Sequence, residues 1–299
     1  MDLPENITIK EVGPRDGLQN EKTEVPTQDK IDWINQLSES GLSYIEITSF
    51  VHPKWIPQLK DAVEVAKSIN RNEEVTYAAL VPNMKGLERA LEADIDEVSI
   101  FMSASESHNQ NNINKSIDQT YPILKEVVNE ARRAGKTVRG YVSTVFGCPY
   151  EGKVDEKQVI KVCHNLLEMG IDELSIGDTI GVANPIQVDY LLRKLERYFP
   201  KDQLALHFHD TRGMALANTL AALQLGYHTF DSSLGGLGGC PYAKGASGNV
   251  ATDDLVHMLN EMGIHHQIDL DKLIEAASLI QSKVNKPLPS KQMEIFRNQ

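Results

Sequence analysis

The 299-residue sequence has few cysteines, no excess of positive charge and no long apolar run. The three cysteines, Cys148, Cys163 and Cys240, are an odd number without CxxC spacing, which argues against a disulfide framework and a four-cysteine zinc site. The net charge of -12 argues against nucleic acid or an anionic membrane as a partner. No uninterrupted apolar run reaches the roughly 18 residues of a membrane span. We therefore expect chemistry on small molecules.

We also expect no targeting segment at the start of the chain. The stretch MDLPENITIKEVGPRDG enters strand-like sequence at about Ile7, without a basic region, an apolar stretch or an Arg-rich leader. Together with the low cysteine content, this predicts a cytoplasmic protein.

Eight short β-rich runs are present, and each is followed by a helix-like segment. This alternation is typical of βαβ units with a parallel sheet. The runs are ITIKEV (from Ile7), YIEITSF (from Tyr44), TYAALV (from Thr76), EVSIFMS (from Glu97), TVRGYVST (from Thr137), ELSIGDT (from Glu173), LALHFHD (from Leu204) and TFDSSLGG (from Thr229). Eight such units in this length predict a closed α/β (β/α)8 TIM barrel, with an open doubly wound sheet as the alternative.

The boundaries of the helical segments agree with this architecture. Thr27, Asp155 and Thr252 are predicted to cap the starts of three helices. We expect a single catalytic domain over residues 1–299, with the barrel at about 7–263. A further amphipathic helix is predicted from Ile268, within a C-terminal extension of about 268–299 that ends in a polar tail.

A histidine pair marks the seventh run. His207 and His209 stand two apart, so on a strand both side chains point to the same face. They come at the carboxyl end of the strand, where barrels of this type carry their active sites. Two imidazoles on one face predict a metal site, and Asp16 and Asn249, from other carboxyl-end loops, could complete it. These ligands suit Mg, Mn or Zn.

The turn GPRDGLQNE follows the first run. Arg15 and Asp16 could form a surface ion pair in a turn shaped by Pro14 and Gly17. At the mouth of a barrel, the same pair could instead hold a chelating oxyanion substrate and stabilise developing negative charge.

The stretch SLGGLGGCPYAKGASGN, from Ser233 to Asn249, is rich in glycine. It has six glycines and lacks the GK[ST] ending of a Walker-type phosphate loop. Such a composition predicts a mobile lid, and Cys240 within it could act as acid, base or nucleophile. Cys163 is interpreted as a buried apolar residue on a helix, and Cys148 is also interpreted as a buried apolar residue.

Two acidic residues stand in apolar strands near their carboxyl ends. Glu46 in YIEITSF and Asp178 in SIGDTIG could accept structural hydrogen bonds, or they could orient ligands and move protons.

Together, EVGPRDGLQNE, the HFHD strand with TRGMALAN, and GGLGGCPYAKGASGN resemble 3-hydroxy-3-methylglutaryl-CoA lyases, metal-dependent enzymes built on a TIM barrel. The resemblance runs from about Ile7 to about Gly263. It implies retro-Claisen cleavage of 3-hydroxy-3-methylglutaryl-CoA to acetyl-CoA and acetoacetate, dependent on Mg or Mn.

The resemblance also implies roles for individual residues. Asp16, His207, His209 and Asn249 would bind the cation, Arg15 would contact the substrate thioester, and Cys240 would be the catalytic thiol. Glu46 and Asp178 match further active-site acids, and His207 or Asp178 is the candidate base. An acyl-CoA substrate, a homo-oligomer, most simply a homodimer, and a place in leucine degradation or ketone-body formation follow from the same resemblance.

Two other functions remain open from the sequence. A Claisen-type synthase of the isopropylmalate or homocitrate kind shares the barrel, the RDG turn and the histidine pair, but usually carries a sizeable C-terminal extension. A noncatalytic metal- or CoA-binding barrel would not explain a thiol on a glycine-rich lid.

Overall fold

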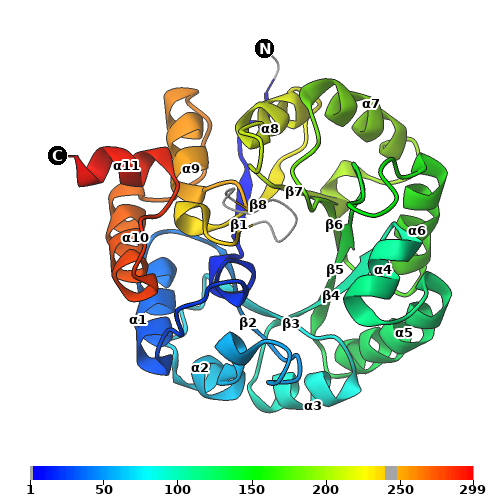
Figure 1. Ribbon diagram of the computed structural model, residues 1–299, viewed down its shortest axis with the longest axis horizontal. Helices are drawn as coiled ribbons and strands as arrows, with labels where there is room; N and C mark the ends of the chain where they lie inside the picture. The colour runs from blue at the N-terminus through cyan, green and yellow to red at the C-terminus, as the bar shows by residue number, and fades with distance from the viewer. Residues whose placement is uncertain (1–2, 240–247, 299) are drawn as a thin grey trace.

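The computed structural model describes residues 3–239 and 248–298, and its centre is a closed barrel of eight parallel strands (Figure 1). The strands follow one another around the barrel in chain order, and β8 closes it against β1. They are β1 (Thr8–Glu11), β2 (Tyr44–Ser49), β3 (Thr76–Leu80), β4 (Glu97–Ser103), β5 (Thr137–Ser143), β6 (Glu173–Asp178), β7 (Leu204–Phe208) and β8 (Thr229–Ser232). The predicted TIM barrel is confirmed, with all eight predicted runs forming strands.

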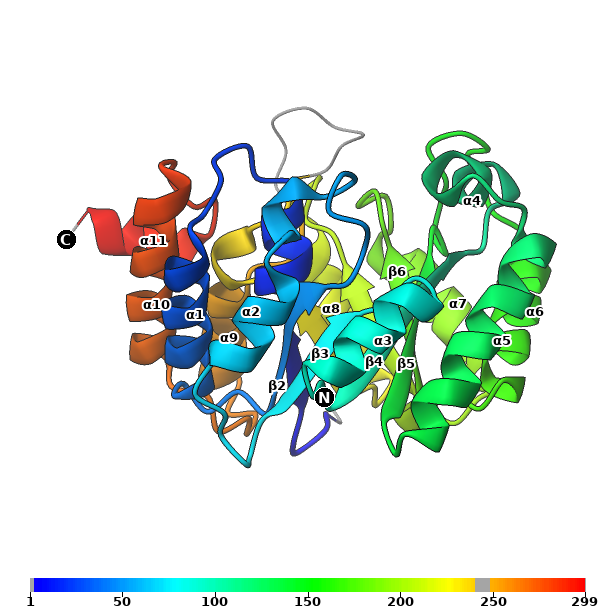
Figure 2. The same cartoon turned by 90° about the horizontal axis from the view of Figure 1, so that it is seen from below.

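Helices surround the barrel and cover the outer face of the sheet (Figure 1). They are α1 (Thr27–Ser38), α2 (Ala62–Ser68), α3 (Met84–Glu92), α4 (Glu106–Ile113), α5 (Ile117–Arg133), α6 (Glu156–Glu168), α7 (Pro185–Leu195), α8 (Ala215–Gln224), α9 (Thr252–Glu261), α10 (Leu270–Val284) and α11 (Lys291–Arg297). In the side view, α4 stands at the end of the barrel where the strands finish (Figure 2). In the described part of the chain, no helix has the length and apolar character needed to cross a membrane.

The core lies between the strands and these helices. Every residue of β2 and of β7 is buried, because helices cover one face of the sheet and side chains fill the barrel on the other. Cys163, on α6, belongs to this core and is fully buried, as the sequence predicted, and Cys148 is also buried.

The barrel interior is unusually rich in charge. Near the amino ends of the strands, Lys10 pairs with Glu173 at 2.8 Å. Above this pair, Arg139 contacts Glu173 at 2.6 Å and Asp231 at 2.5 Å. Buried charges are tolerated only when they are paired and hydrogen-bonded, and these side chains form a connected series of ion pairs inside the barrel.

Two of the three predicted helix caps are wrong. Thr27 and Thr252 are the first residues of α1 and α9, and neither Pro26 nor Ala251 before them makes a side-chain cap. The hydroxyls of both threonines donate to distant carboxylates instead, which a local sequence signal cannot reveal. The Asp155 cap of α6 is confirmed, since its side chain accepts the N–H of Lys157.

The C-terminal extension contains two helices, where the sequence predicted a single helix followed by a polar tail. The predicted helix is α10, which packs beside α1 (Figure 1). The tail then forms α11, capped by Ser290 and anchored by the fully buried Met293. Leu288, between the two helices, is also fully buried and lies against Gly235.

Replacing Gly235 by alanine should destabilise the protein through this contact. Gly235 has a φ of 67°, and a Cβ there would lie 2.3 Å from Cδ1 of Leu288. Gly263 is a matched control, because its φ is 69° and a Cβ would meet nothing within 4 Å. Both variants suffer backbone strain, and Gly235→Ala should lose a further ~1–3 kcal/mol through overpacking. Thermal unfolding of the two variants measures the difference, and equal losses would show that Leu288 does not restrain Gly235.

Candidate active site and metal centre

The predicted histidine pair lies at the carboxyl end of β7. His207 is the fourth residue of the strand and His209 follows its last residue, and their ring centres are 5.2 Å apart. Nδ1 of His207 lies 3.1 Å from Oδ2 of Asp231, and its Nε2 lies 4.0 Å from Oδ2 of Asp16. Because the Asp231 carboxylate accepts the Nδ1 proton, Nε2, on the side of Asp16, is the nitrogen of His207 that could bind a cation.

Asp16 is held by a short helical turn, η1 (Gly13–Gly17), that directly follows β1. The Val12 carbonyl accepts the N–H of Asp16 at 2.7 Å, and the amide of Gln19 donates to Oδ1 of Asp16 at 2.7 Å. Burial alone would raise the pKa of Asp16, but the charge of the Arg15 guanidinium outweighs this effect and lowers it. Asp16 is therefore a carboxylate at neutral pH.

These three side chains form a cluster with the chemistry of a metal site. One ligand atom from each of Asp16, His207 and His209 lies within 4.8 Å of the others. Bonds of about 2.0–2.2 Å to a common cation fit this spacing after small side-chain adjustments. Burial, followed by the neighbouring His207, lowers the pKa of His209 to about 3, so His209 is neutral and able to bind a cation. Its Nδ1 has no hydrogen-bond partner within residues 3–239 and 248–298.

Asn249 lies beside the cluster, as the sequence predicted. A β-bridge joins it to His209, and its amide nitrogen donates to Oδ2 of Asp16 at 2.8 Å and to the Leu237 carbonyl at 3.2 Å. Its buried Oδ1 has no partner among the described residues. A buried amide oxygen without a donor is unfavourable unless another group binds it, so the residues present fit a cation with Asn249 as a further ligand.

Arg15 connects the cluster with Glu46. The Arg15 guanidinium donates to Oε2 of Glu46 at 2.5 Å and to Oδ1 of Asp16 at 2.5 Å, and it lies over the ring of Tyr141. Burial would lower the pKa of Arg15, but Glu46 and Asp16 outweigh it and hold the pKa well above its usual value. The result is a buried, permanent positive charge next to the candidate metal centre.

Glu46 orients this arginine. It is fully buried on β2, and its Oε2 also accepts the Tyr141 hydroxyl at 3.0 Å. Of the two roles considered for Glu46, its contacts show that of a hydrogen-bond acceptor, from Arg15 and Tyr141.

Asp178 ends β6 and is also fully buried. Its two oxygens accept the N–H groups of Val182 and Ala183 at 2.9 and 3.0 Å, so it shapes the loop after the strand. Burial raises its pKa despite these bonds and the opposing effect of His207. The buried Asp178 carboxyl is therefore more basic than that of an exposed aspartate.

Sequence reasoning missed the residues beneath the cluster. Arg139 donates to both oxygens of Asp231, at 2.5 and 3.2 Å, and Asp231 also accepts the Ser175 hydroxyl at 2.7 Å. A signal for them was present in the sequence. Arg139 and Tyr141 stand two apart on β5 and therefore share one face of the sheet, as His207 and His209 do at the end of β7.

Cys240, the eighth residue predicted for the site, lies outside the residues that the structure describes.

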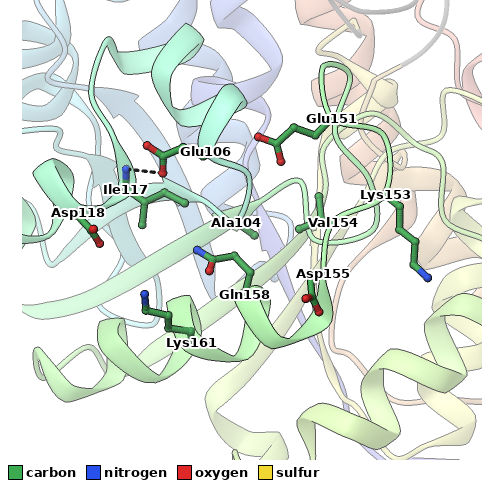
Figure 3. A pocket seen from close by; sticks show the side chains of 10 residues that line it. All are labelled: Ala104, Glu106, Ile117, Asp118, Glu151, Lys153, Val154, Asp155, Gln158 and Lys161. Atoms are coloured by element: carbon green, nitrogen blue, oxygen red, sulfur yellow. Dashed lines mark hydrogen bonds between the residues drawn. The ribbon is translucent and has the colours of Figure 1, made fainter.

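A separate cavity of about 430 Å³ lies between α4, the start of α5 and α6 (Figure 3). Its walls include Glu106, whose carboxylate accepts the N–H of Ile117, and Lys153 and Lys161. None of the residues predicted for the site lines it.

Comparisons with known proteins show the family of the chain. The HMGL-like family model matches residues 6–280. Hydroxymethylglutaryl-CoA lyase YngG of Bacillus subtilis is 60% identical over 298 residues, covering 100% of both chains. The crystal structure of the HMG-CoA lyase from the same organism superposes with a TM-score of 0.98 at 61% identity, covering 99% of this chain and 100% of that one.

A further solved structure is an HMG-CoA lyase from Acinetobacter baumannii in complex with coenzyme A and 3-methylmalate. It is 44% identical, with a TM-score of 0.93, and the match covers 97% of this chain and 95% of that one. On the evidence of the family model and of these relatives, the chain belongs to the HMGL-like family, the family of the hydroxymethylglutaryl-CoA lyases.

Proposed function

We infer that this protein is a lyase that cleaves 3-hydroxy-3-methylglutaryl-CoA to acetyl-CoA and acetoacetate. The observation that carries the inference is the cluster of Asp16, His207 and His209 beside a buried Arg15, in a chain 60% identical over its whole length to a hydroxymethylglutaryl-CoA lyase. The reaction needs a cation that can hold oxygen ligands and a fixed positive charge for a developing enolate. The cluster and the arginine supply both requirements.

We propose Mg or Mn as the cation, bound by Asp16, His207, His209 and the amide oxygen of Asn249. A bound divalent cation acts as a Lewis acid toward the hydroxyl and carboxylate oxygens of a chelating substrate. The neutral state of His209 and the ionised state of Asp16 are the protonation states that such binding requires.

The residues of the chain then have distinct tasks. A base removes the proton of the tertiary hydroxyl, the carbon–carbon bond breaks, and its electrons pass into the thioester enolate while the hydroxyl carbon becomes a ketone. His207 and Asp178 are the two candidates for this base: burial raises the pKa of Asp178, whereas His207 could take the proton only while its Nε2 does not bind the cation. Arg15 stabilises the enolate oxygen, and Glu46 with Tyr141 keeps the guanidinium in place. Cys240 delivers a proton to the enolate carbon, which gives acetyl-CoA.

The synthase alternative is disfavoured by the comparisons, because the chain aligns from end to end with a lyase. We further propose one catalytic domain over residues 1–299, a homodimer, a cytoplasmic location and a role in leucine degradation or ketone-body formation.

The first prediction from this function concerns the reaction itself. Purified, reduced protein should release acetoacetate from 3-hydroxy-3-methylglutaryl-CoA in the presence of Mg or Mn, and chelation should abolish the release because the cation holds the substrate oxygens. A coupled assay of acetoacetate measures it. If instead free CoA appears from acetyl-CoA and a 2-oxo acid, and no acetoacetate is released, the protein is a synthase.

The second prediction concerns the metal ligands. His209→Ala should weaken Mn²⁺ binding by at least about tenfold, because it removes a ligand, and loss of even an outer contact costs this much. Calorimetric titration with Mn²⁺ measures it. His164→Ala is the control, since His164 is exposed on α6 and pairs with Glu168 there. Equal Mn²⁺ affinities of the two variants would remove His209 from the site.

The third prediction concerns the thiol. Cys240→Ser should lower kcat by ~10²–10⁴-fold, as expected for loss of a general acid, while Mn²⁺ affinity stays unchanged. Cys163→Ala is the control and should keep kcat, because Cys163 is buried in the core at α6. Unchanged turnover of Cys240→Ser would exclude the thiol from the proton transfer.

A further inference from the structure

Glu11, the last residue of β1, binds both the turn that follows it and two segments that lie 223 and 241 positions away in the chain. Its side chain is fully buried. Oε1 accepts the N–H of Gly13 at 2.7 Å and the N–H of Leu234 at 2.9 Å, and Oε2 accepts the hydroxyl of Thr252 at 2.5 Å. One carboxyl group therefore ties the start of η1 to the segment after β8 and to the first residue of α9.

Each of these segments leads to a residue of the candidate site. Gly13 begins the turn that carries Arg15 and Asp16. Residues 233–237 and 249–252 are bound to each other: the Ser233 N–H donates to the Val250 carbonyl at 3.0 Å, and the Asn249 amide donates to the Leu237 carbonyl. Glu11 consequently spans the two halves of the site, with Arg15 and Asp16 on one side and Asn249 on the other.

The packing around this junction leaves little room for another arrangement. A Cβ on Gly13 would lie 2.4 Å from Oε1 of Glu11. A Cβ on Gly17 would lie 2.8 Å from the Ser233 hydroxyl and 2.9 Å from Cβ of Leu237. The turn and the segment after β8 are thus in direct contact, and both donate a backbone N–H to the Glu11 carboxyl.

We propose that Glu11 is a positioning residue for the lyase reaction: its hydrogen bonds set the separation of the Arg15–Asp16 turn from Asn249 and so assemble the cation and substrate site. The inference rests on the proposed function. Glu11 acts through backbone N–H groups and one hydroxyl, and its described hydrogen bonds do not include the site side chains themselves.

The hydrogen-bond pattern indicates that Glu11 contributes through the positions of its two oxygen atoms and not through its charge. Oε1 takes both backbone donors, whereas Oε2 faces a hydroxyl that can donate or accept. The Thr252 hydroxyl also lies 2.8 Å from that of Ser232, so it has a second partner in either case. Burial raises the pKa of Glu11 to about 7 in spite of its hydrogen bonds, in agreement with a group that tolerates protonation. A glutamine would present the same oxygen to the two N–H groups and an amide N–H to Thr252.

The test compares Glu11→Gln with Glu11→Ala by kcat and KM for acetoacetate release and by calorimetric Mn²⁺ affinity. Glu11→Ala should lose about tenfold to hundredfold in kcat and bind Mn²⁺ more weakly, because small displacements of catalytic groups have effects of this size. Glu11→Gln should stay within about threefold of the unmodified protein, since it preserves all three contacts.

Asp61→Ala is the matched control for a purely structural loss. Asp61 also ties two segments together, through Lys30 at 2.9 Å and Thr27 at 2.8 Å, but it does so in the outer helical layer at α1. Its variant should lower the melting temperature while keeping kcat and Mn²⁺ affinity. If Glu11→Ala does not fold, Thr252→Val, which removes one of the three contacts, should still weaken Mn²⁺ binding.

Two results would overturn the proposal. Equal losses in Glu11→Gln and Glu11→Ala would mean that the ionised carboxylate, and not its shape, is required. A folded Glu11→Ala with unchanged kcat and Mn²⁺ affinity, or unchanged affinity in Thr252→Val when that variant is needed, would mean that Glu11 positions nothing. Absence of acetoacetate release by the unmodified protein would instead refute the proposed function. The Mn²⁺ titrations of the Glu11 variants would still test whether Glu11 positions the cation site.

Discussion

The buried ion pair between Arg139 and Asp231 is the contact from which the site is built. Both side chains are fully enclosed by the barrel, where an unpaired charge would be strongly destabilising. Arg139 keeps Asp231 ionised, because its charge outweighs the burial that would raise the pKa of that carboxyl, and His207 adds to the effect. An ionised Asp231 then orients the imidazole of His207 through Nδ1. The tautomer of a residue at the mouth of the barrel is therefore set by an arginine inside it.

The same logic explains why neighbouring buried carboxyl groups behave differently. Asp16 and Glu11 stand five positions apart, yet the pKa of Asp16 is lowered and that of Glu11 is raised. Asp16 has the Arg15 guanidinium as a partner, whereas Glu11 has only neutral donors, which offset its desolvation incompletely. A permanently ionised group suits a cation ligand. A group that changes its protonation near neutral pH suits a role that depends on hydrogen bonds and not on charge.

Much of this could be predicted from the sequence, for a physical reason. Strand and helix patterns are local, so eight alternating segments predicted the barrel, and the two-residue spacing of His207 and His209 predicted that they share a face. Since the carboxyl ends of all strands of a barrel meet at one end, Asp16, Arg15, Glu46 and Asn249 were expected near the histidines, and the structure brings them together. What the sequence could not show is long-range pairing. Thr27 and Thr252 look like helix caps, but carboxylates 34 and 241 positions away accept their hydroxyls.

The polar barrel interior also bears on the role of the C-terminal helices. A barrel that fills its centre with ion pairs gives up part of the apolar burial that stabilises a fold, so its mouth must be held by contacts elsewhere. The extension provides such contacts at one place: Leu288 lies on Gly235, the Ser290 N–H donates to the Gly235 carbonyl, and Asp253 accepts both the Gly235 N–H and the Ser290 hydroxyl. Gly235 directly follows Leu234, whose N–H is bound by Glu11. The contacts of the extension with Gly235 and the hydrogen bond of Glu11 to Leu234 therefore restrain the same short segment after β8, the segment that contacts the Arg15–Asp16 turn and Asn249.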